Sequence, residues 1–140
     1  MKTIILSLLL LSTSLTLGQK ILIHAFERQE LVSFSKTSID SVILNPDLTM
    51  DVNDDYIKYV IDLDELTSTY YVNNVSISEL PINHRKLKNG LIKINILEGE
   101  FDYGLLINTD YNNESVTWFW FDTFTTTVKV FKKFVIEKPS

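Results

Sequence analysis

The sequence predicts an all-β fold, an antiparallel meander of seven to nine strands closed into a small barrel or sandwich after an N-terminal signal peptide. Three observations predict this fold class. Apolar and polar residues alternate with a period of two along most of the chain, which is typical of strands with one buried face. Asn, Asp and Gly interrupt the alternation at short intervals, as turn residues between strands do. One segment, Ser115 to Asp122, is aromatic on both faces, which is typical of a strand that is covered on both sides.

Residues 1–18 have the three parts of a secretory signal peptide. Lys2 supplies the positive charge, Ile4 to Leu11 form an apolar stretch, and Thr16-Leu17-Gly18 form a small-x-small cleavage site. The apolar stretch is shorter than the roughly 20 residues that a membrane-spanning helix needs, and no second long apolar run follows. We therefore expect an exported protein with no membrane span and with a single β-domain over residues 19–140.

The composition excludes several classes of function. The chain has no cysteine and four glycines. Disulfides, thiolate metal sites and cysteine nucleophiles are therefore impossible, and the glycine motifs that bind nucleotide phosphates are missing. The formal net charge of −5 repels phosphate backbones, so we expect no nucleic-acid partner. No cofactor is predicted either, since no cofactor-binding motif is present. Export without disulfides favours a bacterial protein in the periplasm or outside the cell.

The first half of the domain is expected to hold several strands. Ile21 to Phe26 and Glu30 to Ser35 are expected to be additional strands or a cover for the barrel. The segment Tyr56 to Leu66 alternates without a break and is rich in β-branched residues, which favours a strand. The helical spacing of its residues Tyr56, Tyr59, Val60 and Leu63 leaves a helix as the alternative.

Two turns connect this segment to the strands that follow. A turn at Asp64-Glu65 and a turn at Asn73-Asn74 keep the aromatic and β-branched residues on one face. The predicted pairs are Ile57 with Val72, Tyr59 with Tyr70, Val72 with Val75, and Tyr70 with Ile77.

Glu98-Gly99 is predicted to be the two-residue turn of a hairpin. That turn makes one side of the hairpin apolar and leaves the other mostly polar, as a half-buried hairpin requires. Asn89-Gly90 is a second turn dipeptide, and Pro81 restricts the strand that precedes it. The predicted apolar pairs are Ile96 with Phe101, Ile94 with Tyr103, and Ile92 with Leu105.

The last two strands are the most β-prone segments, Ser115 to Asp122 and Thr126 to Ile136. Val116, Trp118 and Trp120 are predicted to share the face of Tyr103, Leu105 and Ile107, whereas Phe119 and Phe121 point the other way with Val128 opposite Phe119.

These aromatic residues give the leading functional hypothesis, a non-enzymatic domain that binds a small molecule or a protein. Tyr103, Trp118 and Trp120 are the candidate binding residues for a small apolar or sugar-like ligand. The alternative is that the same rings only fill the barrel. Candidate partner-binding residues on the reverse face are Phe119, Phe121, Val128 and Val130, which form an apolar patch if they are exposed.

Two further functions stay open. A carbohydrate-active hydrolase needs two acids that converge in an aromatic cleft, but Glu98 and Glu100 flank a turn and are expected to point into water. A structural or inhibitory module predicts no cavity and an uncovered face at Phe119 and Phe121. No catalytic residue is assigned, because His24 and His84 have no partner in a recognisable motif.

Acidic residues between positions 47 and 55 raise the question of calcium. Asp51, Asn53 and Asp55 have the spacing of the first ligands of an EF-hand loop, but Tyr56 occupies the position that requires glycine. The EF-hand is therefore excluded and no metal site is predicted. A looser calcium site that uses Asp47, Asp51, Asp54 or Asp55 is left open.

Overall fold

The computed structural model describes residues 20–53 and 55–137, and this part of the chain forms nine strands, one α-helix and one short 3-10 helix. The predicted all-β class and strand number are confirmed. The predicted signal peptide lies outside the described residues. The strands are β1 (Lys20–Ser33), β2 (Leu48–Val52), β3 (Ile57–Asp62), β4 (Thr67–Val72), β5 (Val75–Lys86), β6 (Leu91–Ile96), β7 (Asp102–Asn108), β8 (Ser115–Phe121) and β9 (Thr126–Glu137); the helices are α2 (Ile39–Leu44) and η1 (Lys88–Gly90).

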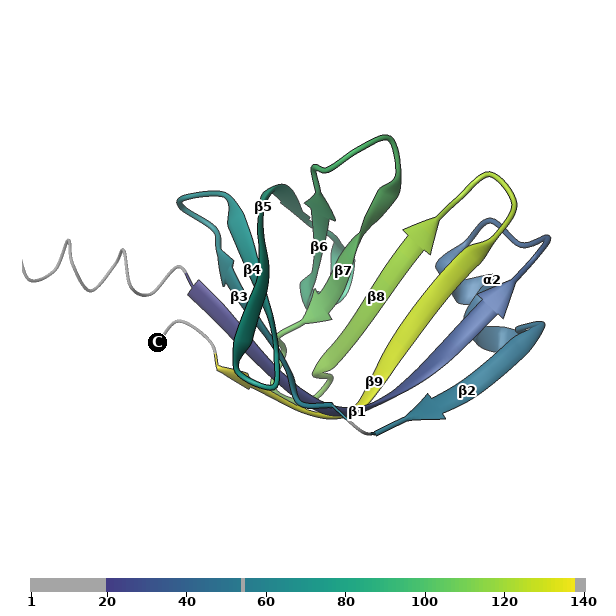
Figure 1. The fold of residues 1–140 in the computed structure, drawn as a ribbon, viewed down its shortest axis with the longest axis horizontal. Helices are drawn as coiled ribbons and strands as arrows, with labels where there is room; N and C mark the ends of the chain where they lie inside the picture. Colours follow the sequence, from purple (N-terminus) through teal and green to yellow (C-terminus); the bar gives the residue numbers. More distant parts are fainter. Residues whose placement is uncertain (1–19, 54, 138–140) are drawn as a thin grey trace, which may run out of the picture.

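Eight of these strands close into an antiparallel barrel. They pair in the order β1-β3-β4-β5-β6-β7-β8-β9, and β9 pairs back with β1. The other edge of β1 is shared, because β3 pairs with its first half and β2 pairs with its second half. In Figure 1, β1 and β9 run side by side and extend past the barrel toward β2 and α2. The barrel is therefore a ring of eight strands that follow one another in sequence order, except that β2 is left out and pairs with β1 outside the ring.

A bulge in β1 exchanges the residues that face the interior. The register with β9 shifts between Ala25 and Glu27 and again between Glu27 and Arg28. Before the bulge, the buried core residues are the odd-numbered Ile21, Ile23 and Ala25. After it, Arg28 lies opposite the core residue Phe131 and Glu30 lies opposite Lys129. Since opposed residues share a face, the bulge turns two charged side chains inward.

The β3–β4 hairpin has the predicted register, with Ile57 opposite Val72 and Tyr59 opposite Tyr70. The pairing of Val72 with Val75 is also confirmed, and the helical alternative for this segment is wrong. The pairing of Tyr70 with Ile77 is wrong, because an irregularity between Tyr70 and Tyr71 places Ser78 opposite Tyr70.

The register predicted for the β6–β7 hairpin is wrong by two residues. Ile94 pairs with Leu105 instead of Tyr103, so the connection is longer than a two-residue turn. The physical reason is the close approach of the two strands at Gly104, which pairs with Asn95 in the observed register: a Cβ at this position would lie 1.8 Å from the carbonyl oxygen of Ile94, so only glycine fits there. A shift of two keeps every side chain on its predicted face, and Ile94 and Tyr103 both belong to the interior core.

Pro81 marks the point at which β5 changes partners. β5 pairs with β4 as far as Pro81 and with β6 from Ile82 onward. Proline has no N–H to donate to a ladder, and a change of partner tolerates that loss better than the middle of a ladder does.

The predicted shared face of Tyr103, Leu105 and Ile107 with Val116, Trp118 and Trp120 is confirmed, as is the predicted pairing of Phe119 with Val128. Tyr103 pairs with Trp120, Leu105 with Trp118, and Ile107 with Val116. Phe119 pairs with Val128.

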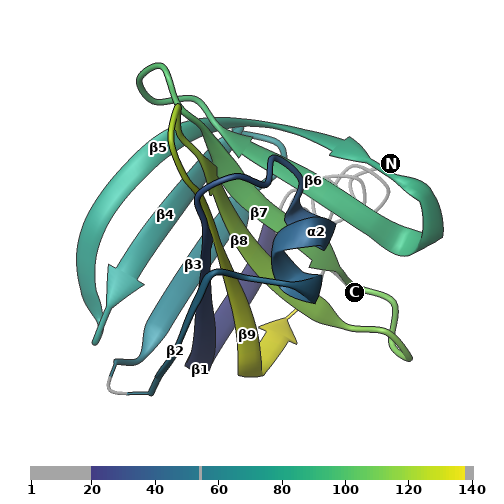
Figure 2. The ribbon, with the colours of Figure 1, turned by 90° about the vertical axis from the view of Figure 1, so that its right-hand side faces the viewer.

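The barrel has an interior core and a smaller outer core under α2. The fully buried interior residues include Ile23, Ile61, Ile94 and Leu105. On the outside, Val42 of α2 packs against Leu31 of β1 and Val128 of β9, and Figure 2 is viewed from the side that carries this helix. No helix within the described ranges is long and apolar enough to cross a membrane.

Candidate functional site

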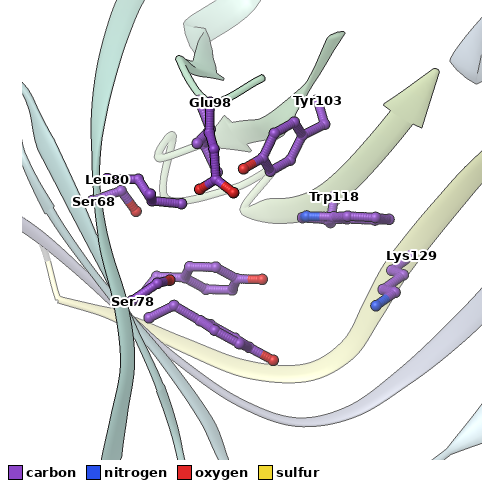
Figure 3. A pocket seen from close by; sticks show the side chains of 10 residues that line it. Ser68, Ser78, Leu80, Glu98, Tyr103, Trp118 and Lys129 are labelled. Atoms are coloured by element: carbon purple, nitrogen blue, oxygen red, sulfur yellow. The ribbon is translucent and has the colours of Figure 1, made fainter. Parts of the chain in front are cut away.

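A cavity of about 280 Å³ opens into the barrel. Every strand from β3 to β9 contributes at least one side chain to its wall, together with the β6–β7 loop, because the cavity is part of the barrel interior. Four of the lining residues are aromatic and most of the others are polar. Figure 3 shows the labelled side chains arranged around the open space. The lining residues are Tyr59, Ser68, Tyr70, Ser78, Leu80, Ile96, Glu98, Tyr103, Trp118 and Lys129.

Two buried hydroxyl groups of the wall have no protein partner. Tyr59 is 6% exposed and Ser68 is 3% exposed, and neither hydroxyl forms a hydrogen bond within the described part of the chain. In that part, the only side-chain polar atom that is sealed from solvent and forms no hydrogen bond is Nε2 of His24, which lies 3.3 Å from Oε1 of Glu137. The hydroxyls of Tyr59 and Ser68 therefore reach the cavity, where a ligand or water can bind them.

Burial keeps the tyrosine hydroxyls protonated. Desolvation raises the pKa of Tyr59 far above its ordinary value, and the neighbouring Tyr70 adds to the effect. Desolvation also raises the pKa of Tyr70, although the positive charge of Arg28 opposes this. Both groups are neutral hydrogen-bond donors at any physiological pH.

Glu98 brings a carboxylate to the mouth of the cavity. Its carboxylate is turned toward the cavity beside Tyr103 (Figure 3). The pKa of Tyr103 is raised, first by burial and then by the charge of Glu98 and the hydrogen bond between the two side chains. Glu98 is exposed, as expected, but it also lines the cavity, because the longer β6–β7 loop places this side chain at the cavity mouth.

Lys129 supplies the cation of the wall. Its Nζ lies 4.4 Å from the centre of the Trp118 ring and 3.8 Å from Oε1 of Glu30. The same oxygen of Glu30 accepts a hydrogen bond of 3.2 Å from Nε of Arg28. Burial lowers the pKa of Lys129, and the charge of Glu30 opposes that shift. Two cations thus share one carboxylate on the inner face of the barrel.

Trp118 presents its edge to the cavity. Lys129 lies over its ring, and the nearly parallel ring of Trp120 is 6.1 Å away. The edge that carries the indole nitrogen points toward the open space (Figure 3). Trp118 is therefore placed to donate a hydrogen bond to a ligand.

Trp120 differs from the other two candidate ligand-binding residues. Tyr103 and Trp118 line the cavity, whereas Trp120 does not. Its ring packs instead against Phe101 at 4.6 Å and against Tyr103 at 4.7 Å between ring centres. Trp120 thus supports the wall from behind.

The four candidate partner-binding residues do not form an exposed patch. Phe119 and Val128 are 0% exposed, Val130 packs against the outer core under α2, and Phe121 is partly buried beside Phe119. The α2 helix covers part of this face, and the ammonium of Lys93 lies over the Phe119 ring.

The acidic residues considered for calcium are engaged separately. Asp47 accepts hydrogen bonds from the backbone of Phe34 and the hydroxyl of Ser33, and the first of these is the main cause of its lowered pKa. Asp51 binds Gln29 and Asp55 binds Asn73. Within the described part of the chain no group of three or more His, Cys, Asp or Glu is placed to hold a metal ion, and Asp54 lies outside that part.

Sequence reasoning missed most of the polar wall. Lys129 lies two residues before Phe131 on the same strand, so the two side chains share a face. This spacing was the signal that Lys129 faces inward. For Arg28 and Glu30 no such signal existed, because the bulge in β1 reverses their parity. Comparison of the chain with protein-family models, with curated proteins and with solved structures gave no match.

Proposed function

We propose that this protein is an exported, non-enzymatic binding protein whose barrel cavity takes one small, hydroxyl-rich ring molecule such as a monosaccharide. The observation that carries the proposal is the pair of buried hydroxyls, on Tyr59 and Ser68, that face the cavity without a protein partner. A buried polar group left unpaired costs about 1–3 kcal/mol, so such groups are expected where a ligand satisfies them. The leader-like residues 1–18 support export.

The chemistry of the wall favours a polar ring over a hydrocarbon. Tyr70 and Ser78 add two more hydroxyls to those of Tyr59 and Ser68, and Glu98 adds an acceptor. A hydrocarbon would strip water from these groups and return no hydrogen bond. The volume of 280 Å³ lies near the lower limit of small-molecule sites, which begin at about 300 Å³, and suits a single ring.

The same wall argues against hydrolysis by a carboxylate pair. That chemistry needs two carboxyl groups about 5–10 Å apart on either side of the scissile bond. Among the lining residues Glu98 is the one acid, and the nearby Glu30 is held by Arg28 and Lys129. A purely structural module, in turn, gives no reason for a polar cavity.

Binding is testable by tryptophan fluorescence and calorimetry. The chain has two tryptophans and both belong to the cavity wall or its support, so fluorescence reports on this region. We expect a pentose, a hexose or one of their acids to bind, and Tyr59→Phe to weaken that binding about tenfold. Because the hydroxyl has no protein partner, Tyr59→Phe should leave the free energy of unfolding nearly unchanged.

Tyr111→Phe is the matched control, since Tyr111 is 84% exposed and lies outside the cavity wall. It should bind like the wild type. The proposal fails if no sugar or sugar acid binds, or if the two tyrosine variants behave alike. Export is tested separately by sequencing the N-terminus of the protein recovered outside the cytoplasm, which should begin at Gln19.

A further inference from the structure

The inner face of the barrel carries a cluster of three charged side chains beside the cavity. Arg28 and Lys129 contribute two positive charges and Glu30 contributes one negative charge. The three side chains are 14%, 28% and 21% exposed, so bulk water screens them only partly. Lys129 is the member of this cluster that lines the cavity, whereas Arg28 and Glu30 line a neighbouring hollow together with Asp51 and Asp55.

The ammonium of Lys129 has room for a further acceptor. Its distance of 3.8 Å from Glu30 is longer than the 2.7–3.2 Å or so of a hydrogen bond. Its other contact, the face of Trp118, accepts no conventional hydrogen bond. The ammonium is thus partly desolvated, without a short hydrogen bond to a carboxylate.

A second donor lies beside Lys129. Trp118, whose ring lies 4.4 Å from the ammonium, points its indole N–H into the open space (Figure 3). Glu98, the one carboxylate of the lining, lies beside Tyr103 and away from Lys129 (Figure 3). The cavity therefore presents donors and a positive charge at one side and an acceptor at the other.

We infer that the ligand is a sugar acid or a similar hydroxylated monocarboxylate, with its carboxylate at Lys129 and its hydroxyl groups toward Glu98. The inference rests on the proposed function and names the ligand class of the same cavity. A neutral sugar would give the ammonium no carboxylate closer than that of Glu30, at 3.8 Å. A phosphate would bring more negative charge than a monocarboxylate, and Glu98 would repel it.

Matched pairs of ligands test the inference. D-glucuronate and D-galacturonate share their rings with D-glucose and D-galactose and differ in the carboxylate. By calorimetry and tryptophan fluorescence, we expect at least one acid to bind about tenfold or more tightly than its neutral partner. Added salt should weaken the binding of the acid and leave that of the neutral sugar unchanged, a measurement that needs only the wild-type protein.

Lys129→Met is the decisive variant, because methionine keeps most of the side-chain volume and removes the charge. The preference for the acid over the neutral sugar should disappear. Lys129→Arg should keep the preference. Lys133→Met is the control, since Lys133 lies on the same strand but is 69% exposed and pairs with Glu27.

The outcomes separate this inference from the proposed function. Equal binding of acid and neutral sugar overturns the inference and leaves the proposed function standing. A preference for the acid that survives in Lys129→Met overturns the placement of the carboxylate, and tighter binding of glucose 6-phosphate than of glucuronate overturns the ligand class. If no sugar of either kind binds, the proposed function and the inference fall together.

Discussion

Gly104 allows two strands of the barrel to come into close contact. A Cβ atom at this position would lie 1.8 Å from the carbonyl oxygen of Ile94, which is backbone and cannot swing aside. Gly104 pairs with Asn95 of β6 on one side and with Phe119 of β8 on the other, so its backbone position is fixed by both neighbouring strands. The strand of Gly104 and its two neighbours carry Tyr103, Ile96 and Trp118 into the cavity wall, and the shape of the cavity therefore depends on a residue that has no side chain.

Gly104→Ala should lower the free energy of unfolding by about 3 kcal/mol, because β6 and β7 must move apart to admit the methyl group. Urea unfolding followed by circular dichroism measures the loss. Gly99→Ala is the control: a Cβ there meets nothing closer than Phe101 at 3.9 Å, and only its positive φ of 69° costs about 1 kcal/mol. Equal losses in the two variants would contradict the close approach of the strands.

At the scale of elements, the short helix α2 covers the outer face of the β1–β9 pair. Ser38 caps its N-terminus by accepting a hydrogen bond from the backbone of Ser41. Only Val42 of this helix is fully buried, against Leu31 and Val128. A helix of six residues is too short to be stable alone, so this contact holds it in place.

Val42→Ala should therefore cost about 2 kcal/mol, since it removes buried methyl groups and leaves a cavity under the helix. Leu44→Ala, on the same helix but 85% exposed, should change stability by less than about 0.5 kcal/mol. Thermal unfolding of the two variants checks the difference. Similar effects would mean that the helix does not depend on this contact.

At the scale of the whole molecule, the barrel closes by pairing the first strand with the last. β1 begins at Lys20 and β9 ends at Glu137, and they are paired from Leu22 with Glu137 to Ser33 with Thr126. Closure leaves no free edge within the ring, and it forms the enclosed space in which the cavity lies. It also demands contacts between residues far apart in the sequence.

Refolding is therefore expected on the millisecond-to-second timescale. The reason is that β1 and β9, which lie at opposite ends of the domain in sequence, must meet before the barrel can form. Stopped-flow dilution from urea, with tryptophan fluorescence as the signal, measures the rate. Refolding within microseconds would contradict a rate set by this closure.

The sequence by itself determined the all-β class, the meander from Tyr56 onward and the face of most side chains, because the alternation of apolar residues is a local pattern that a register shift of two leaves intact. Tyr103 and Trp118 were identified as wall candidates in this way. The tertiary structure alone decided the polar half of the site. A bulge in β1 turned Arg28 and Glu30 inward. A long loop between β6 and β7 placed Glu98 at the mouth of the cavity. Bulges and loop lengths depend on how neighbouring strands pair, so no local sequence pattern predicts them.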